Sequence, residues 1–203
     1  FSVGDTALKT RPVVVGLGPA GLFAALLLAR SGYRPLVLER GPALDGRIRA
    51  VSHFEKTGEL DPNANIQFGE GGAGTFSDGK LTTRVGDPLC AFVTGAFLDH
   101  GAPADIAWRQ KPHVGTDLLR DVIRSIRGEI ESLGGEVRFN TALTGLQIRN
   151  GALTGIDTTA GSVACEQLIL AVGHSARDTF AMLHELGLPL ACKPFSVGFR
   201  AEH

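Results

Sequence analysis

The sequence lacks an excess of charge of either sign. Its 203 residues include 20 Lys and Arg against 21 Asp and Glu, so the formal net charge is -1 at pH 7. A surface that binds nucleic acid usually carries a basic excess, and that excess is missing here. With 43% hydrophobic residues, the chain can still bury a core large enough for one domain. We therefore expect a globular protein that acts on a small-molecule substrate and does not bind nucleic acid.

Long hydrophobic runs are missing as well. The longest run near the N-terminus, GLFAALLLA, has nine residues, whereas a membrane span needs about 20. No basic segment or cleavage site of a signal peptide accompanies it. The cysteines Cys90, Cys165 and Cys192 are too far apart for a C-x-x-C pair or a four-cysteine metal site. These absences predict a cytoplasmic protein without a membrane partner.

Familiar catalytic and metal-binding patterns are also absent. The spacing of the reactive side chains assembles neither a Ser-His-Asp nor a Cys-His arrangement. His100, His113 and His174 show no metal-ligand pattern. The sequence thus predicts no metal and leaves the catalytic residues unknown.

The ends of the sequence predict a fragment of a longer protein. The chain does not begin with methionine, and near its end Phe195, Val197 and Phe199 alternate with small or polar residues, as in a half-buried strand. We expect residues 1–10 to be a leader or linker from a missing N-terminal region. Residues 191–203 are expected to begin a truncated substrate-side domain.

Residues 11–40 contain the pattern of a βαβ unit. The β-branched run Val13–Val15 is typical of a strand buried in a parallel sheet, and a glycine turn follows it at once. Helix-forming residues extend from Ala20 to Arg30, and Gly32 is suited to end that helix. The second apolar run, Pro35–Leu38, completes the unit. This order of elements predicts a Rossmann-like sheet.

Three further helices are predicted after a glycine-rich stretch of loops and short helices at 41–87. The first continues toward Leu98, the second is amphipathic, and the third starts with a capping box. The predicted capping residues are, in order, Asp87, then Thr116 or Asp117, then Ser175 with Asp178.

Short strands are predicted between about 137 and 165. The segments EVRFN, TGLQIR, ALTGIDT and SVAC form this run, and Asn150-Gly151 is typical of a hairpin turn. They predict a small antiparallel β-segment. The fold class expected for the chain is therefore α/β, a Rossmann-like domain with a parallel sheet flanked by helices. This domain would cover residues 11–190, with 85–116 as an inserted helical or loop segment.

A glycine motif carries the clearest functional signal. Gly16-Leu17-Gly18-Pro19-Ala20-Gly21 fits G-x-G-x-x-G between a predicted strand and a predicted helix, and Glu39 follows 18 positions beyond Gly21. Gly16 permits the tight turn, Gly18 lets a pyrophosphate approach, and Gly21 allows close packing of the helix. Glu39 is placed to accept hydrogen bonds from ribose hydroxyls, and its charge would repel a 2′-phosphate. NAD and FAD both remain possible cofactors at this point.

Two segments resemble the FAD-binding domain of two-dinucleotide-binding-domain flavoproteins. In that superfamily the first loop is commonly G-x-G-P-A-G, and the second strand ends in Glu-Arg, as Glu39-Arg40 does. The stretch LILAVG, 168–173, is similar to the late strand that ends in A-T-G, with Val172 in place of the threonine. The resemblance implies that Ala171 and Gly173 are small because this loop passes close to the cofactor.

Longer stretches are similar to one family of bacterial FAD-dependent oxidoreductases, described as NAD(FAD)-utilising dehydrogenases. The similar stretches are FGEGGAGTFSDGKLTTR, KPHVGTD, ILAVGHSARDTF and KPFSVGFR, and the resemblance covers essentially all of 11–203. It implies an FAD-binding domain that is interrupted by a substrate-side domain. It does not imply a particular substrate.

The resemblance also implies further contacts with the cofactor. It places the glycine loop 69–80 beside the flavin and the backbone near Thr141 to Leu143 beside the adenine. The residues that it adds to the predicted cofactor site are Pro19, Ala20, Arg40, Gly71, Gly72, Gly74, Thr75 and Leu143.

Three side chains are candidates for a catalytic role. His174 and Arg177 follow the late flavin loop and could assist proton transfer. Lys80 could provide a fixed positive charge near the flavin or the pyrophosphate. The alternatives are that His174 only precedes the helix and that Lys80 faces solvent.

The stretch GTFSDGKLTT, residues 74–83, also satisfies the G-x-x-x-x-G-K pattern of a nucleotide-triphosphate loop. Such a loop needs a buried strand before it and a hydroxyl directly after the lysine. The preceding segment is polar and rich in glycine, and Leu81 occupies the hydroxyl position. The pattern therefore favours a flavin loop over an NTPase.

The sequence predicts an FAD-binding oxidoreductase of the dehydrogenase or reductase type, in which electrons pass through the flavin. An FAD-dependent hydroxylase and a non-catalytic FAD- or NAD-binding module remain alternatives. Only one dinucleotide fingerprint is present, so any NAD(P)H would bind outside this segment, act as a transient electron donor, or not be used. The substrate and the oligomeric state stay open.

Overall fold

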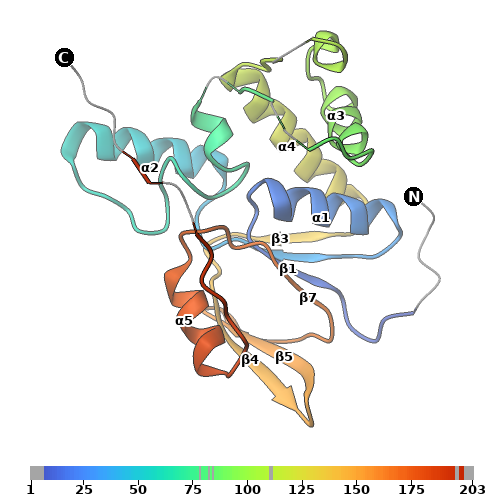
Figure 1. The fold of residues 1–203 in the computed structure, drawn as a ribbon, viewed down its shortest axis with the longest axis vertical. Helices are drawn as coiled ribbons and strands as arrows, with labels where there is room; N and C mark the ends of the chain where they lie inside the picture. Colours follow the sequence, from blue (N-terminus) through green and yellow to red (C-terminus); the bar gives the residue numbers. More distant parts are fainter. Residues whose placement is uncertain are drawn as a thin grey trace.

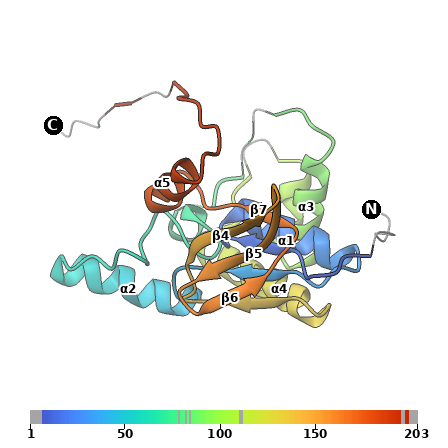
Figure 2. The same cartoon turned by 90° about the horizontal axis from the view of Figure 1, so that it is seen from below.

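The structure is a computed structural model that describes residues 7–77, 79–81, 83, 85–109, 112–194 and 197–198. These residues form three layers: a set of helices, a parallel sheet and a smaller antiparallel sheet (Figures 1 and 2). The parallel sheet is the middle layer. Its two faces are covered by different partners, so its central strands, Val13–Val15 and Leu36–Leu38, are buried on both faces.

The parallel sheet has the strand order β3-β2-β1-β7. Each strand is three residues long: β1 (Val13–Val15), β2 (Leu36–Leu38), β3 (Glu136–Arg138) and β7 (Leu168–Leu170). All neighbouring strands run parallel, and Val14 pairs with Val37 on one side and Ile169 on the other. The carboxyl ends of the strands therefore meet at one edge of the sheet, which is where open α/β sheets bind their ligands.

The helical layer covers one face of this sheet. It consists of α1 (Pro19–Arg30), α3 (Cys90–Asp99), η2 (Ala104–Ala107) and α4 (Thr116–Ser132). Val14 and Val37 point into the same apolar cluster as Leu22, Leu26 and Ile126. Side chains alternate between the two faces of a strand, so the neighbours of Val14 face the other way.

The antiparallel sheet covers the opposite face. Its strands are β4 (Leu143–Arg149), β5 (Ala152–Thr158) and β6 (Gly161–Ala164), and α5 (Arg177–Glu185) lies beside β4. Val13 and Val15 form a second apolar cluster with Ile156 and Cys165. The two remaining elements, α2 (Leu44–Thr57) and η1 (Ala73–Phe76), lie to one side of the sheet in Figure 1.

The α/β fold class with its βαβ unit and its small antiparallel segment is confirmed, with one correction. The sequence assigned EVRFN to the antiparallel run, but β3 joins the parallel sheet beside β2. The Glu136 N–H donates to Pro35 O at 2.9 Å, and the Glu39 N–H donates to Arg138 O at 2.9 Å. Helices also flank only one face of the parallel sheet, because the antiparallel sheet occupies the other.

The predicted helix caps are wrong, although the helices themselves are present. Helix α3 begins at Cys90 instead of directly after Asp87, whose carboxylate accepts the Leu89 N–H at 2.7 Å in a turn before the helix. The caps of α4 and α5 are the backbone positions Gly115 and Ala176, neither of which provides a capping side chain. The side chains predicted as caps bind elsewhere: Thr116 donates to Ser77 O at 2.6 Å, and Asp178 accepts from Arg40 and from the Thr179 N–H.

The segment 85–116 packs into the helical layer. It contains α3 and η2, and it contributes Ala96, Phe97, Ile106 and Val114 to the cluster around Val14. The strand predicted near the C-terminus, at Phe195 to Phe199, lies outside the described residues except for 197–198.

Side-chain hydrogen bonds join the end of α1 to α4. The Arg30 guanidinium donates two hydrogen bonds of 2.8 Å to the Glu129 carboxylate, and the His100 Nε2 atom lies 2.7 Å from the same group. The hydrogen bonds from Arg30 have the largest effect on the pKa of Glu129, which they lower. The contact with His100 lowers it as well. The ionised form of Glu129 therefore stabilises the contact between the dinucleotide-motif helix and its neighbour.

We predict that Glu129→Gln reduces the free energy of unfolding near neutral pH by about 1–3 kcal/mol, because it breaks a charged hydrogen-bonded pair. The folded pKa of Glu129 is lowered, so this stability is present above its unfolded pKa of about 4.3 and is lost as the pH falls through the folded pKa. Urea unfolding between pH 3 and pH 7 measures both effects. Glu131→Gln, on the exposed side of α4, is the control, and equal pH dependence in the two variants would contradict the prediction.

Candidate functional site

A cavity of about 520 Å³ lies at the carboxyl edge of the parallel sheet. Its walls come from the loops after β1, β2 and β7, from residues 67–73, from the connection before β4 and from α5. A volume of this size falls within the roughly 300–1,000 Å³ range of small-molecule sites. The position is the one at which a parallel α/β sheet binds a ligand.

The loop between β1 and α1 requires glycine at two positions. Gly16 has a φ of +99°, and a Cβ atom there would lie 2.4 Å from Ala171 O. A Cβ atom on Gly21 would lie 1.8 Å from Gly16 O, so this glycine allows α1 to pack against the loop. The tight turn and the close helix packing predicted for these two residues are therefore present.

Unlike Gly16 and Gly21, Gly18 faces open space. No heavy atom beyond its chain neighbours lies within 4 Å of the place that a Cβ atom would take. Gly18 is the N-cap of α1, no side chain caps this helix, and Pro19 and Ala20 line the cavity beside it. The first N–H groups and the positive dipole end of α1 are thus directed to the cavity, which is the arrangement that binds phosphate groups.

The Glu39 side chain links the end of β2 to the loop between β1 and α1. Its side chain is only 5% exposed, and its two carboxylate oxygens accept the Leu17 N–H at 2.8 Å and the Gly41 N–H at 2.9 Å. Burial raises the pKa of Glu39, while these hydrogen bonds and the charge of Arg47 oppose the rise. Each carboxylate oxygen has a second lone pair, and Glu39 lines the cavity. A contact with ribose hydroxyls is compatible with this geometry and stays a prediction.

A buried guanidinium binds the glycine-rich loop, residues 65–76, on the other side of the cavity. Arg47, in α2, is 1% exposed, and burial lowers its pKa to about 10, so it is protonated at neutral pH. Its guanidinium also lies 4.7 Å from the centre of the Phe76 ring. It donates hydrogen bonds of 2.8–2.9 Å to the carbonyl oxygens of Asn65, Ile66, Glu70 and Gly72 and to the Thr75 hydroxyl.

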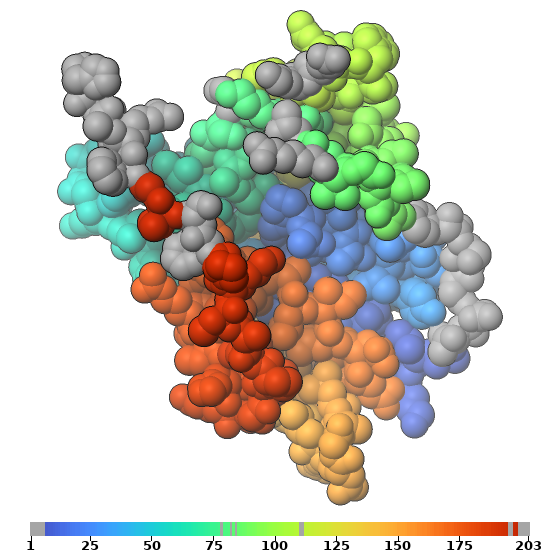
Figure 3. Space-filling view, viewed as in Figure 1, coloured from blue at the N-terminus to red at the C-terminus, as the bar shows by residue number. Residues whose placement is uncertain are grey.

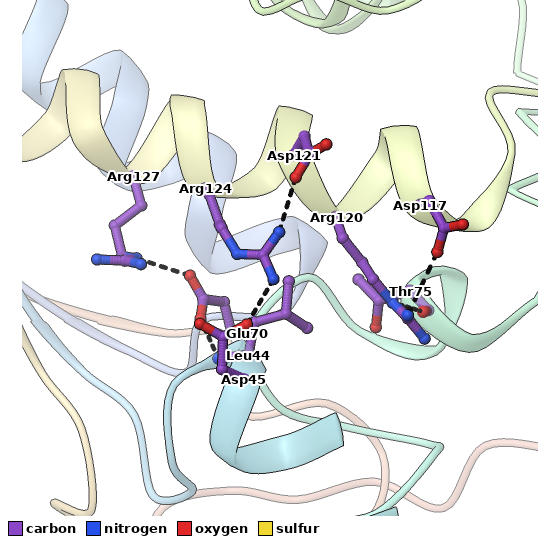
Figure 4. A network of polar contacts seen from close by, with 9 residues as sticks. All are labelled: Leu44, Asp45, Glu70, Thr75, Asp117, Arg120, Asp121, Arg124 and Arg127. Carbon is purple, nitrogen blue, oxygen red and sulfur yellow. Dashed lines mark hydrogen bonds and ion pairs between the residues drawn. The ribbon is translucent and has the colours of Figure 1, made fainter. Parts of the chain in front are cut away.

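A second set of contacts joins the same loop to α4 (Figure 4). The Glu70 carboxylate is fully buried and accepts the Leu44 N–H at 2.6 Å and the Arg127 Nε–H at 2.8 Å. One turn from the start of α4, Arg120 donates to Thr75 O at 2.9 Å. The loop is therefore bound from α2 by Arg47 and from α4 by two arginines.

The two glycine loops touch each other. The Gly71 N–H donates to Leu17 O at 2.9 Å, and a Cβ atom on Gly72 would lie 2.6 Å from Pro19 Cδ. Gly69, Gly71 and Gly72 all have positive φ, of 108°, 77° and 70°. The shape of the second loop thus determines how closely it approaches the start of α1.

Most of the predicted site residues come together around the cavity. Those that line it are Gly16, Gly18, Pro19, Ala20, Glu39, Arg40, Gly72, Leu143, Ala171, Gly173 and His174. The sequence predicted all of them, and the structure brings them from five separate segments to one edge of the sheet.

The other predicted residues do not reach the cavity lining. Gly21 lies beneath the first loop, Gly71 faces Ile123 and Thr75, and Gly74 faces Leu119. Thr75 is fully buried, and its hydroxyl both receives a hydrogen bond from Arg47 and donates one to Gly72 O. The remaining two are Lys80, which forms a β-bridge with His113, and Arg177, the first residue of α5.

The structure adds lining residues that were not among the predicted site residues. Gln67 and Phe68 line the cavity from the glycine-rich loop, and Thr179, Phe180 and Leu183 line it from α5. The amphipathic spacing of α5 could indicate a buried face. It could not indicate that this face closes a cavity formed by the first βαβ unit.

Comparison with known proteins agrees with this geometry. Residues 14–74 match the family described as NAD(P)-binding Rossmann-like domain. An uncharacterised protein of Clostridium beijerinckii is 52% identical over 200 residues, which cover 98% of this chain and 38% of that protein. The chain thus spans well under half the length of this curated relative.

The fold is also found in a solved structure. The crystal structure of THI4 from Thermovibrio ammonificans superposes with a TM-score of 0.55 at 14% identity, over 89% of this chain and 64% of that one. L-amino acid deaminase from Proteus myxofaciens, in complex with anthranilate, gives a TM-score of 0.47 at 16% identity, over 92% of this chain and 50% of that one. At 14% identity the similarity to THI4 concerns the fold alone.

The fold and the glycine fingerprint define a Rossmann-like α/β protein. The fingerprint lies within residues 14–74, the segment that matches the NAD(P)-binding Rossmann-like family. The fold class predicted from the sequence is confirmed, and the match of residues 14–74 agrees with the dinucleotide motif predicted there. Among the described residues, no helix is long and apolar enough to cross a bilayer. Nor does the described part of the chain contain a group of three or more His, Cys, Asp or Glu side chains that could hold a metal ion.

We predict that Arg47→Met lowers the free energy of unfolding by about 3–5 kcal/mol, because several buried carbonyl groups lose their donor at once. Arg49→Met is the control, since Arg49 lies on the exposed side of the same helix. Urea unfolding of both variants at pH 7 measures the difference. Equal midpoints would show that Arg47 does not hold the loop.

Proposed function

We propose that the protein binds FAD in this cavity and is an oxidoreductase that passes electrons through the flavin. The observation that carries the proposal is the uncapped start of α1, which opens at Gly18 into a cavity that is bordered by a buried carboxylate, Glu39. A helix N-terminus of this kind favours a pyrophosphate, and a carboxylate after the second strand favours an unphosphorylated ribose.

The residues present fit an extended dinucleotide. The pyrophosphate would rest on the N–H groups of Gly18 and Ala20, since Pro19 has none, and the adenosine ribose would bind Glu39. The adenine would lie beside the backbone of Thr141 to Leu143, which lines the cavity next to α5. Ala171 and Gly173 have small side chains where the late loop passes the site, which lets the backbone approach a ligand closely.

The flavin would lie toward the loops 69–80 and 171–177. When bound, FAD supplies two-electron chemistry, while the protein binds, orients and tunes the cofactor. Of the three candidates for a catalytic role, His174 lines the cavity, whereas Lys80 and Arg177 do not. His174 is therefore the candidate that we retain. NAD(P)H is a candidate electron donor in this account; because this segment has one dinucleotide fingerprint, NAD(P)H would bind outside the segment or dock transiently.

A nicotinamide dinucleotide as the resident cofactor is the second candidate. The family description of residues 14–74 favours it, since that family is named for NAD(P) binding. The same glycine loop and carboxylate would hold its adenosine half. Direct comparison of the two ligands separates the candidates.

We predict that the full-length protein is purified with bound flavin, or takes up FAD when it is added, and shows the visible absorbance of a flavoprotein. Anaerobic addition of NADH and of NADPH then measures which donor reduces it. A colourless protein that binds NAD and fails to bind FAD would contradict the proposal and favour the second candidate.

We also predict that Gly18→Ala weakens FAD binding by at least about tenfold, or about 1.4 kcal/mol. Gly18 has an ordinary φ of -66°, and a methyl group there meets no protein atom. The folded protein should tolerate the change, so the methyl group would obstruct only the pyrophosphate. The thermal unfolding midpoint without FAD should remain unchanged.

The matched control is Gly95→Ala, in α3, where a Cβ atom also meets no protein atom. Isothermal titration with FAD compares the two variants with the unmodified protein. Unchanged FAD affinity in Gly18→Ala would mean that the pyrophosphate does not rest on this loop.

A further inference from the structure

Helix α5 forms one wall of the cavity. Thr179, Phe180 and Leu183 line the cavity from this helix, and Leu143 lines it from the start of β4. Figures 1 and 2 show α5 beside β4, at a distance from the helical layer. The helix and the segment after it lie on the outer surface of the molecule (Figure 3). A ligand that fills the cavity therefore contacts a peripheral helix on one side and the Rossmann-like sheet on the other.

Few interactions hold α5 in this position. Leu183 is buried, and Met182 packs on the apolar cluster that contains Val13 and Val15. The backbone hydrogen bonds of α5 stay within the helix and its two ends. Among the residues that the structure describes, the Arg40–Asp178 pair is the one side-chain hydrogen bond or ion pair that joins α5 to another element.

This pair crosses the edge of the cavity. Arg40 follows Glu39 at the end of β2 and lines the cavity, whereas Asp178 lies in the first turn of α5. The side chain of Arg40 is 30% exposed and that of Asp178 is 60% exposed. Water and salt therefore reach the pair, and it can open and close reversibly.

We propose that Arg40 and Asp178 form a latch that holds α5 against the cavity and controls how fast a dinucleotide enters and leaves. The inference rests on the proposed function, because it takes FAD as the ligand of this cavity. The Arg40–Asp178 pair is formed in the structure, so the latch is closed. A dinucleotide that passes a closed latch meets the same barrier when it enters and when it leaves.

A latch has a kinetic signature that a simple ligand contact lacks. Loss of a contact that is made only in the complex speeds dissociation and leaves association unchanged. Loss of a latch that is closed in both the free and the bound protein speeds both steps. Exposed ion pairs are weak, so the expected change is about twofold to fivefold in each rate.

The experiment uses stopped-flow measurement of flavin fluorescence with the full-length protein. It compares the unmodified protein with Asp178→Asn and Asp178→Glu. The control is Asp99→Asn, because Asp99 has the same 60% side-chain exposure and also pairs with an arginine, Arg30, but lies away from the cavity. Each protein is measured at low salt and at high salt, because salt screens an exposed pair.

We expect Asp178→Asn to raise the association and dissociation rate constants of FAD together by about twofold to fivefold. Asp178→Glu and Asp99→Asn should keep the rates of the unmodified protein. High salt should accelerate both steps in the unmodified protein more than in Asp178→Asn. The dissociation constant should change little in every variant.

Two results would overturn the latch. One is unchanged FAD kinetics in Asp178→Asn, and the other is faster dissociation without faster association. Both are distinct from failure of the proposed function, in which the unmodified protein would not bind FAD at all. Equal unfolding midpoints of Asp178→Asn and Asp99→Asn show that α5 has not unfolded.

Discussion

The cavity depends on one buried positive charge, that of Arg47. The loop at 65–76 turns its carbonyl oxygens inward, and without a donor these groups would be buried unsatisfied at a large cost. Arg47 provides donors to four of them and to the Thr75 hydroxyl. The ordered loop then contacts Leu17 and Pro19. Arg47, helped by Arg120 and Arg127 from α4, therefore positions the opposite wall of the cavity against the start of α1.

Two buried carboxylates, Glu39 and Glu70, lie near Arg47, and each has its own hydrogen-bond donors. Glu39 is held by backbone N–H groups, and Glu70 is held by Leu44 and by Arg127 from α4. The network joins α2, α4 and both glycine loops. By contrast, α5 is attached by apolar packing and by one exposed ion pair among the described residues. The cavity thus combines one wall that a buried hydrogen-bond network holds with another wall, α5, that fewer interactions hold.

The sequence was sufficient for features that depend on local spacing. The valines of β1, the glycines at 16, 18 and 21 and the carboxylate at 39 predict the βαβ unit and the first half of the site. The sequence was insufficient for features that depend on contacts between distant segments. The assignment of β3 depends on its pairing with β2, and Thr116 and Asp178 bind partners outside their own helices. Nothing in the local pattern of Phe180 or Gln67 reveals which distant segment each one faces.

The central claim is that the start of α1 at Gly18 binds the pyrophosphate of FAD. A crystal structure of the full-length protein with bound FAD tests it most directly. The account predicts pyrophosphate oxygens within hydrogen-bonding distance of the N–H groups at the start of α1, with the adenosine ribose at Glu39. A pyrophosphate bound elsewhere, or an adenosine half directed away from Glu39, would contradict the account.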